Sequence, residues 1–132
     1  MTTPSAGPAG LPTVLIVDDT LIVRTMLRRW LETAGYQVDD AADGYEALSR
    51  LTHGAPVDVI VTDLRMPRMG GRELAAEIKA LHLDTPMLFI SGYDAHISGA
   101  DIPGPVLAKP FMAEQLVARV RQLLPRPQPR TA

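Results

Sequence analysis

The sequence predicts a single α/β domain in which a five-stranded parallel sheet carries helices on both faces, giving three layers. Two observations predict this fold class. Short apolar runs, typical of strands buried on both faces, alternate with longer segments of helical periodicity along the chain. The 132 residues are also enough for one domain with a buried core. Right-handed crossovers would join the successive parallel strands.

The elements are placed by their apolar residues and by the signals at their ends. Strands are expected at residues 14–17, 36–38, 57–62, 86–90 and 106–108, and helices at residues 21–34, 43–51, 70–81 and 113–124. The apolar face of the first helix is expected to contain Leu27, Trp30, Leu31 and Ala34. Arg24, Arg28 and Glu32 of that helix are expected to face water. Gly35 is a plausible stop for it, and Asp43 can cap the helix that follows.

The interval between the fourth and fifth strands departs from this alternation. Residues 94–100 are long enough for only one or two helical turns, and glycine or proline at positions 99 and 103–105 breaks regular structure. The fourth helix is therefore predicted to be short or irregular.

Composition and the chain ends limit the possible functions. Net charge is −2 and the pI is about 5.9, which is not the basic balance of an electrostatic nucleic-acid binder. The chain has no cysteine, which excludes disulfides and thiolate chemistry and fits a cytoplasmic location. No apolar run approaches the roughly 18 residues of a membrane span, so we expect no membrane partner. We expect a disordered leader at residues 1–11, the domain at 12–125 and a flexible proline-rich tail at 126–132.

Three aspartates follow predicted strands, since Asp18 and Asp19 follow the first and Asp63 ends the third. Parallel strands end at one edge of the sheet. In the doubly wound order 2-1-3-4-5, strands one and three are neighbours at the switch point, where ligands bind. We therefore expect these carboxylates to converge. Clustered carboxylates repel one another unless a cation lies between them, and hard oxygen ligands with room for water and phosphate favour Mg²⁺.

The same edge carries a hydroxyl and an ammonium group, because Ser91 ends the fourth predicted strand and Lys109 the fifth. A carboxylate nucleophile, a metal site and a fixed cation are the parts that phosphoryl transfer needs. Each residue alone has a simpler explanation. The aspartate pair can cap the next helix, Asp63 and Ser91 can belong to turns, and Lys109 can simply be an extended residue before proline. Their joint placement at four strand ends favours a site.

Four motifs resemble those of one known family. They are VLIVDD at residues 14–19, DLRMPRMGG at 63–71, SG at 91–92 and KPF at 109–111. With them the chain resembles the response-regulator receiver family of two-component signalling, which has a flavodoxin-like fold, over roughly residues 12–125. The spacing of the DLRMPRMGG string, together with the aspartate pair and KPF, makes this resemblance highly specific.

The resemblance implies a role for each acidic residue. Asp63 would be the phosphoacceptor, forming an acyl phosphate. Asp19 and Asp63 would be direct Mg²⁺ ligands, Asp18 would hold a metal-bound water, and the backbone carbonyl of Arg65 would be the remaining protein ligand.

The resemblance also implies how a bound phosphoryl group would be sensed. Lys109 would pair with the phosphoryl oxygens, in a Lys109–Pro110 bond that is usually cis in this family. Ser91 would hydrogen-bond a phosphoryl oxygen and draw its loop inward. The family commonly has an aromatic residue three positions before the lysine, where this chain has Val106. Tyr93 could take over as the reporter, or it could merely shield the mouth of the pocket.

The function implied is a single-domain response regulator that accepts a phosphoryl group from a sensor histidine kinase or a histidine phosphotransfer protein. It would catalyse only its own phosphorylation and dephosphorylation, and it would signal to a downstream protein target or pass the group on in a phosphorelay. A short fourth helix disfavours the usual dimer face, so a monomer is expected. The alternative is a phosphorylation-independent binding module of the same fold. A haloacid-dehalogenase-type phosphatase is excluded, because it needs an aspartate two positions after Asp18, where Thr20 stands.

Overall fold

The computed structural model describes residues 10–92 and 102–124, and it confirms the predicted sheet. All strand pairs are parallel, and the order is β2-β1-β3-β4-β5. The strands are β1 (Thr13–Val17), β2 (Gln37–Ala41), β3 (Val59–Asp63), β4 (Met87–Ser91) and β5 (Val106–Ala108).

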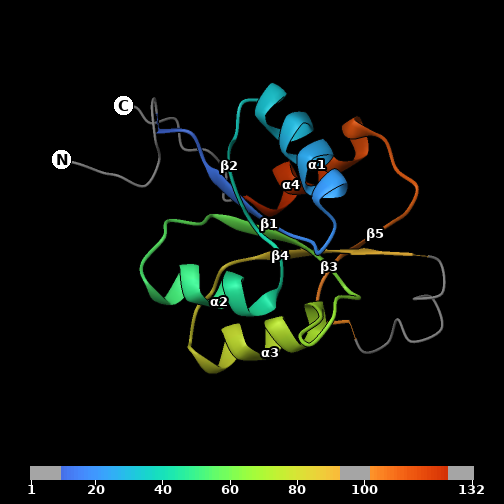
Figure 1. Ribbon diagram of the computed structural model, residues 1–132. Helices are drawn as coiled ribbons and strands as arrows, with labels where there is room; N and C mark the ends of the chain where they lie inside the picture. The colour runs from blue at the N-terminus through green and yellow to red at the C-terminus, as the bar shows by residue number, and fades with distance from the viewer. Residues whose placement is uncertain (1–9, 93–101, 125–132) are drawn as a thin grey trace.

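Helices cover both faces of this sheet, as Figure 1 shows. They are α1 (Leu21–Thr33), α2 (Gly44–Thr52), α3 (Gly71–Ala80) and α4 (Ala113–Leu123). α1 and α4 lie on one face, and α2 and α3 lie on the other. Two separate apolar clusters result, because alternate residues of a strand face opposite sides. Val14 and Ile16 of β1 belong to the first cluster, and Leu15 and Val17 belong to the second.

The helix ends follow from local chemistry. The Asp43 carboxylate accepts a hydrogen bond from the backbone N–H of Glu46 at 2.8 Å, which confirms the predicted cap of α2. Gly35 follows α1 with a φ of 101°, a left-handed conformation that glycine adopts without strain. Leu27 and Leu31 are buried as predicted, but Ala34 lies beyond the end of α1 and is exposed. The helix therefore ends one residue earlier than expected.

Strand β2 is longer than its sequence suggests, because it continues through two aspartates. The carboxylate of Asp39 lies 3.0 Å from Nη1 of Arg50 in α2, and that of Asp40 lies near arginines of α1. These ion pairs allow acidic residues on an edge strand that is covered by helices on both sides. Charged side chains on an edge strand also discourage pairing with other chains.

The predicted short fourth helix, the predicted reporter Tyr93, and most of the predicted leader and tail lie outside the described residues. Residues 102–105, which precede β5, contain no helix. Within the described ranges, no helix is both long and apolar enough to cross a membrane. The proposed domain limits remain a prediction.

Candidate functional site

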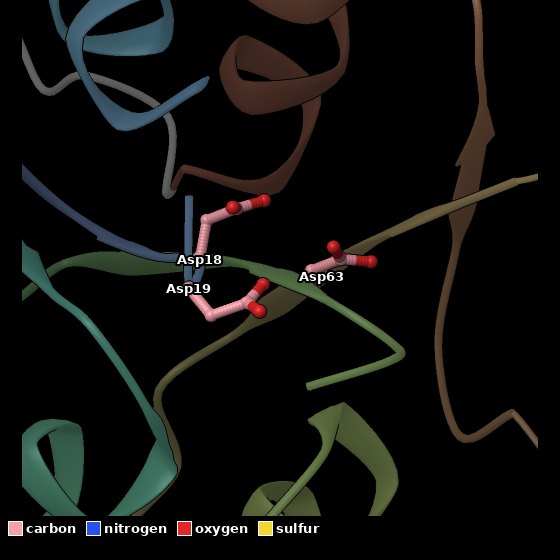
Figure 2. A group of neighbouring side chains, drawn as sticks. All are labelled: Asp18, Asp19 and Asp63. Carbon is pink, nitrogen blue, oxygen red and sulfur yellow. The ribbon is translucent and has the colours of Figure 1, made fainter. Parts of the chain in front are cut away.

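Three aspartates meet at the carboxyl-terminal edge of the sheet, as predicted. β1 and β3 are paired in register, with Val17 beside Thr62, so the residues that follow or end these strands come together. Carboxylate oxygens of Asp18, Asp19 and Asp63 all lie within 4.8 Å of one another (Figure 2). More than 40 residues of sequence separate the aspartate pair from Asp63, and the sheet order alone brings them together.

Asp18 is the most enclosed of the three, with 2% of its surface exposed. Its backbone N–H donates to the carbonyl of Ala41 at 3.2 Å, and its Oδ1 accepts from the N–H of Thr20 at 2.8 Å. Burial, followed by the nearby charge of Asp63, raises the pKa of Asp18 from 3.8 to about 6, although the Thr20 hydrogen bond opposes the rise. Enclosure by the fold, more than neighbouring charge, is therefore what disfavours the ionised form of Asp18.

Asp63 ends β3 with its carboxylate directed into the same edge, and only 12% of its side chain is exposed. Its Oδ1 accepts from the N–H of Arg65 at 3.3 Å, and its Oδ2 lies 3.7 Å from Nζ of Lys109. The loop after Asp63 is tied back at Gly71, whose N–H donates to the carbonyl of Leu64 at 3.1 Å. A Cβ on Gly71 would lie 2.7 Å from the Asp63 carbonyl oxygen, so this close approach requires glycine.

Ser91 and Lys109 are joined through the backbone. Ser91 is the last residue of β4 and is buried, and the N–H of Lys109 donates to its carbonyl at 2.8 Å. The Lys109–Pro110 bond is cis, as predicted. Val106 is half-buried beside Phe89 in the sheet register. The structure thus brings Lys109 and Ser91 to the acidic edge. It places Val106, three residues before the lysine in the sequence, on β5.

The donor set fits a hard divalent cation. Carboxylate oxygens are ligands that Mg²⁺ prefers, and a bound cation would offset the repulsion among the three clustered carboxylates. Asp63 and Asp19 are close enough to share one ion, with Asp18 next to them. Arg65 is placed by its N–H bond to Asp63, and the role of its carbonyl as a ligand remains a prediction.

Sequence reasoning missed one residue at this site. Arg24 was expected to face water, but only 16% of its side chain is exposed, and its Nη1 donates to the carbonyl of Asp18 at 2.7 Å. Helical periodicity places the Cα of an arginine on a face, whereas the long side chain reaches back from that face. A basic residue one turn into the helix that follows the aspartate pair was the available signal.

A doubly wound sheet with an acidic cluster and a lysine at one edge is the architecture of receiver-type α/β domains, and solved structures of that class resemble it closely. Chemotaxis protein CheY4 of Vibrio cholerae is 34% identical and has a TM-score of 0.72. The alignment covers 86% of this chain and 99% of that one. A response regulator receiver protein from Sinorhizobium medicae is 31% identical, with a TM-score of 0.77 over 86% of this chain and 94% of that one.

Sequence comparison defines the family. The model of the response regulator receiver domain matches residues 14–121, so the chain belongs to the response regulator receiver domain family. Response regulator MprA of Mycobacterium tuberculosis (strain H37Rv) is 39% identical over 123 residues, which are 90% of this chain and 53% of that protein. The chain therefore spans about half the length of the curated relatives it matches.

Proposed function

We propose that this receiver domain accepts a phosphoryl group on Asp63 from the phosphohistidine of a sensor kinase or phosphotransfer protein in the cytoplasm. The observation that carries the proposal is the convergence of three carboxylates with Lys109 at one sheet edge. Burying the Asp18 carboxylate costs free energy, as its raised pKa reflects. In a binding module without chemistry, no function would offset that cost.

In this reaction an Asp63 carboxylate oxygen attacks the phosphorus atom, a P–O bond forms, and the P–N bond to the donor histidine breaks. The imidazole leaves with the electron pair of that bond and takes up a proton. Asp63 is oriented for attack by the Arg65 N–H on Oδ1, and Oδ2 faces Lys109. The ammonium group of Lys109 would neutralise charge on the phosphoryl oxygens.

Asp18, Asp19, Asp63 and the carbonyl of Arg65 would hold Mg²⁺. When bound, the ion supplies positive charge that offsets repulsion between the aspartates and the incoming phosphoryl group. The hydroxyl of Ser91, a buried residue, would then hydrogen-bond a phosphoryl oxygen, and its backbone bond to Lys109 would make the two residues respond together. The domain would act as a monomer that signals through a protein partner or a phosphorelay, with no catalysis beyond its own phosphorylation and dephosphorylation.

The test is to incubate the chain with acetyl phosphate and Mg²⁺ and to measure its intact mass. We expect the wild type to gain the mass of one phosphoryl group and Asp63→Asn to gain none. A wild type that gains no mass would favour the phosphorylation-independent binding module. A gain that survives Asp63→Asn would move the acceptor to another residue.

A further inference from the structure

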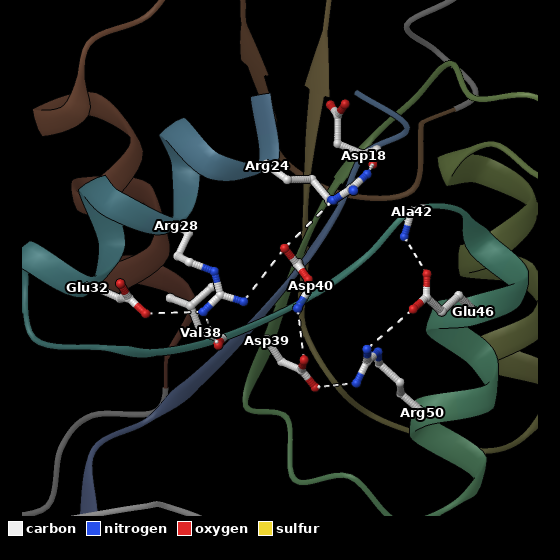
Figure 3. Close-up of polar contacts among 10 residues, drawn as sticks. All are labelled: Asp18, Arg24, Arg28, Glu32, Val38, Asp39, Asp40, Ala42, Glu46 and Arg50. Carbon is white, nitrogen blue, oxygen red and sulfur yellow. Dashed lines mark hydrogen bonds and ion pairs between the residues drawn. The ribbon is translucent and has the colours of Figure 1, made fainter. Parts of the chain in front are cut away.

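Arg24 of α1 contacts the backbone of the acidic pair rather than its carboxylates. Its guanidinium donates from Nη1 to the carbonyl oxygen of Asp18 at 2.7 Å, and its Nε lies 3.7 Å from Oδ2 of Asp40 on β2. Figure 3 shows this side chain spanning the gap between the end of β1 and the edge strand. One guanidinium therefore connects two elements at the site.

Asp40 is itself held in place. Its carboxylate also lies 3.6 Å from Nη2 of Arg28, whose Nη1 donates to the carbonyl of Val38 at 2.9 Å (Figure 3). In the sheet register Asp40 is the neighbour of Ile16 in β1. The anchor of Arg24 is thus a carboxylate fixed by a second arginine that also binds the backbone of β2.

The carbonyl that Arg24 binds belongs to the peptide unit joining Asp18 to Asp19. This unit is planar, so holding the oxygen fixes the direction in which the chain leaves Asp18 and enters Asp19. On the other side, the N–H of Asp18 is held by the carbonyl of Ala41 at 3.2 Å. The backbone of the aspartate pair is therefore restrained from both β2 and α1.

We propose that Arg24 is a positioning residue for the Asp18–Asp19 pair, and that Asp40 holds Arg24 in place. The inference rests on the proposed function, since it assumes that the pair binds a divalent cation. The contacts of Arg24 are to the Asp18 carbonyl and the Asp40 carboxylate, and not to the carboxylates of Asp18 and Asp19. It acts on the carboxylates through the peptide that carries them.

Two other roles for Arg24 lead to different results. If the guanidinium acted only through its charge, removing this cation would strengthen binding of a divalent ion at the acidic edge. If it served only to hold α1 against β2, its loss would lower the melting temperature and leave ion affinity unchanged in the folded protein. A positioning role instead predicts weaker ion binding in a protein that is still folded.

The experiment measures Mn²⁺ affinity of the full chain by isothermal titration calorimetry at one pH and ionic strength, well below each variant's melting temperature. We expect Arg24→Met to lower the affinity about tenfold, the effect of losing a hydrogen bond made by a charged donor. Arg24→Lys keeps the charge but lacks the guanidinium, whose separate nitrogens contact Asp18 and Asp40. We expect it to lower the Mn²⁺ affinity less, by about threefold. Asp40→Asn should also weaken binding, by about twofold to threefold, because Arg24 loses its anchor.

Arg50→Met is the matched control. Arg50 makes the corresponding contacts on the other side of the same edge strand, to Asp39 at 3.0 Å and to Glu46 at 3.3 Å (Figure 3). Those contacts reach no residue of the acidic site. We expect Arg50→Met to bind Mn²⁺ with wild-type affinity, whatever it does to the melting temperature.

Wild-type or stronger Mn²⁺ binding by folded Arg24→Met would overturn the inference, as would an equal loss in Arg50→Met. If Arg24→Met does not fold, Arg24→Lys and Asp40→Asn decide, and wild-type affinity in both would overturn it. A wild type that binds no Mn²⁺ would instead count against the proposed metal site, so the two failures are distinguishable.

Discussion

The ends of β1 and β5 carry the two halves of the candidate site, and they are attached to the fold in different ways. Asp18, after β1, is buried and is bonded to β2, to the turn before α1 and to Arg24. Lys109, after the three-residue strand β5, is bonded to Ser91 through its backbone N–H, but 40% of its side chain is exposed and its ammonium lies 3.7 Å from Asp63. That distance is longer than a hydrogen bond.

We call Asp18 and Asp19, after β1, the fixed half of the site, and Lys109, after β5, the adjustable half. An acidic group that must hold a cation benefits from a geometry set before the ion arrives, because no ordering is then needed on binding. On the proposed function, a lysine that must follow the oxygens of an incoming phosphoryl group needs reach rather than rigidity, and a flexible four-carbon stem supplies it. Half-buried Val106 offers no aromatic ring to couple the two halves, so we expect Ser91 and Lys109 to carry the response.

The largest effect, on the rate of phosphorylation, should come from removing the divalent cation. Treating the protein with EDTA leaves three carboxylates facing the phosphoryl donor, and we expect phosphorylation by acetyl phosphate to slow by at least about a hundredfold. The rate of mass gain measures it. Restoring Mg²⁺ in excess should restore the rate, which controls for damage to the protein. A metal-stripped sample that reacts at the original rate would show that Lys109 alone supplies the charge.

The second prediction concerns Asp18 in the metal-free protein. Its pKa is raised to about 6 in the folded state from 3.8, so between about pH 4 and pH 6 the folded state binds more protons than the unfolded state. The free energy of unfolding should therefore fall as pH rises through that window. The fall should total about 2 to 3 kcal/mol and be complete by about pH 7. Urea denaturation in EDTA at several pH values measures it.

Asp18→Asn is the control for this prediction, because it removes the titrating group while keeping the side-chain shape. Its stability should lose most of that pH dependence, and at pH 7 without metal it should exceed the wild-type stability. Adding Mg²⁺ should stabilise the wild type more than the variant. An unchanged pH profile in Asp18→Asn would assign the titration to another group.

The strand ends that form the site were predictable from the sequence, whereas the full length of β2 was not. The sheet order and the meeting of the aspartates with Ser91 and Lys109 were predicted, because parallel strands must end at one edge whatever their side chains do. β2 was predicted too short, since Asp39 and Asp40 interrupt its apolar pattern, and only contacts with Arg24, Arg28 and Arg50 make them tolerable. Long-range ion pairs of this kind leave no local signal.

Arg24 shows the same limit within the site. Its helical position predicted exposure, but a guanidinium at the end of a flexible stem can lie several ångströms from the surface that its Cα faces. The bond to the Asp18 carbonyl depends on the angle at which α1 leaves β1, and residue spacing does not specify that angle. The elements were therefore predictable, whereas the contacts between their ends were not.

The third prediction compares two glycines that flank the ring of Phe89. A Cβ on Gly71 would meet the Asp63 carbonyl oxygen at 2.7 Å and the Phe89 ring at 3.3 Å, whereas one on Gly104, before β5, would meet the Phe89 ring at 3.0 Å. We expect Gly71→Ala to cost about 2 kcal/mol, because its Cβ would collide with a backbone oxygen at 2.7 Å. Gly104→Ala should cost about 1 kcal/mol, because its nearest neighbour is a side chain and the backbone oxygen of Met87 lies farther away, at 3.3 Å. Urea denaturation measures both, and equal costs would show that the two sides are equally rigid.

The smallest effects on the free energy of unfolding should come from the N-caps of α2 and α4. Asp43 caps α2 with its carboxylate. Met112, the N-cap of α4, has no side-chain oxygen, and its backbone N–H donates to the side-chain Oε1 of Gln115 at 2.7 Å. Asp43→Ala should therefore cost about 1 kcal/mol of stability. Met112→Ser should gain up to about 1 kcal/mol, since it adds the acceptor that α4 lacks.

The Asp43 contribution should also depend on pH in a direction opposite to that of Asp18. The Glu46 N–H and then Arg68 hold the pKa of Asp43 below 3.8, so its stabilising effect is present above about pH 4 and is lost as pH falls further. The difference in unfolding free energy between wild type and Asp43→Ala should shrink between pH 5 and pH 3. Met112→Ser, which adds no titrating group, should keep a constant difference over that range. If Met112→Ser gives no gain, the start of α4 is held by its packing rather than by its cap, and the half of the site that carries Lys109 is more rigid than its exposure indicates.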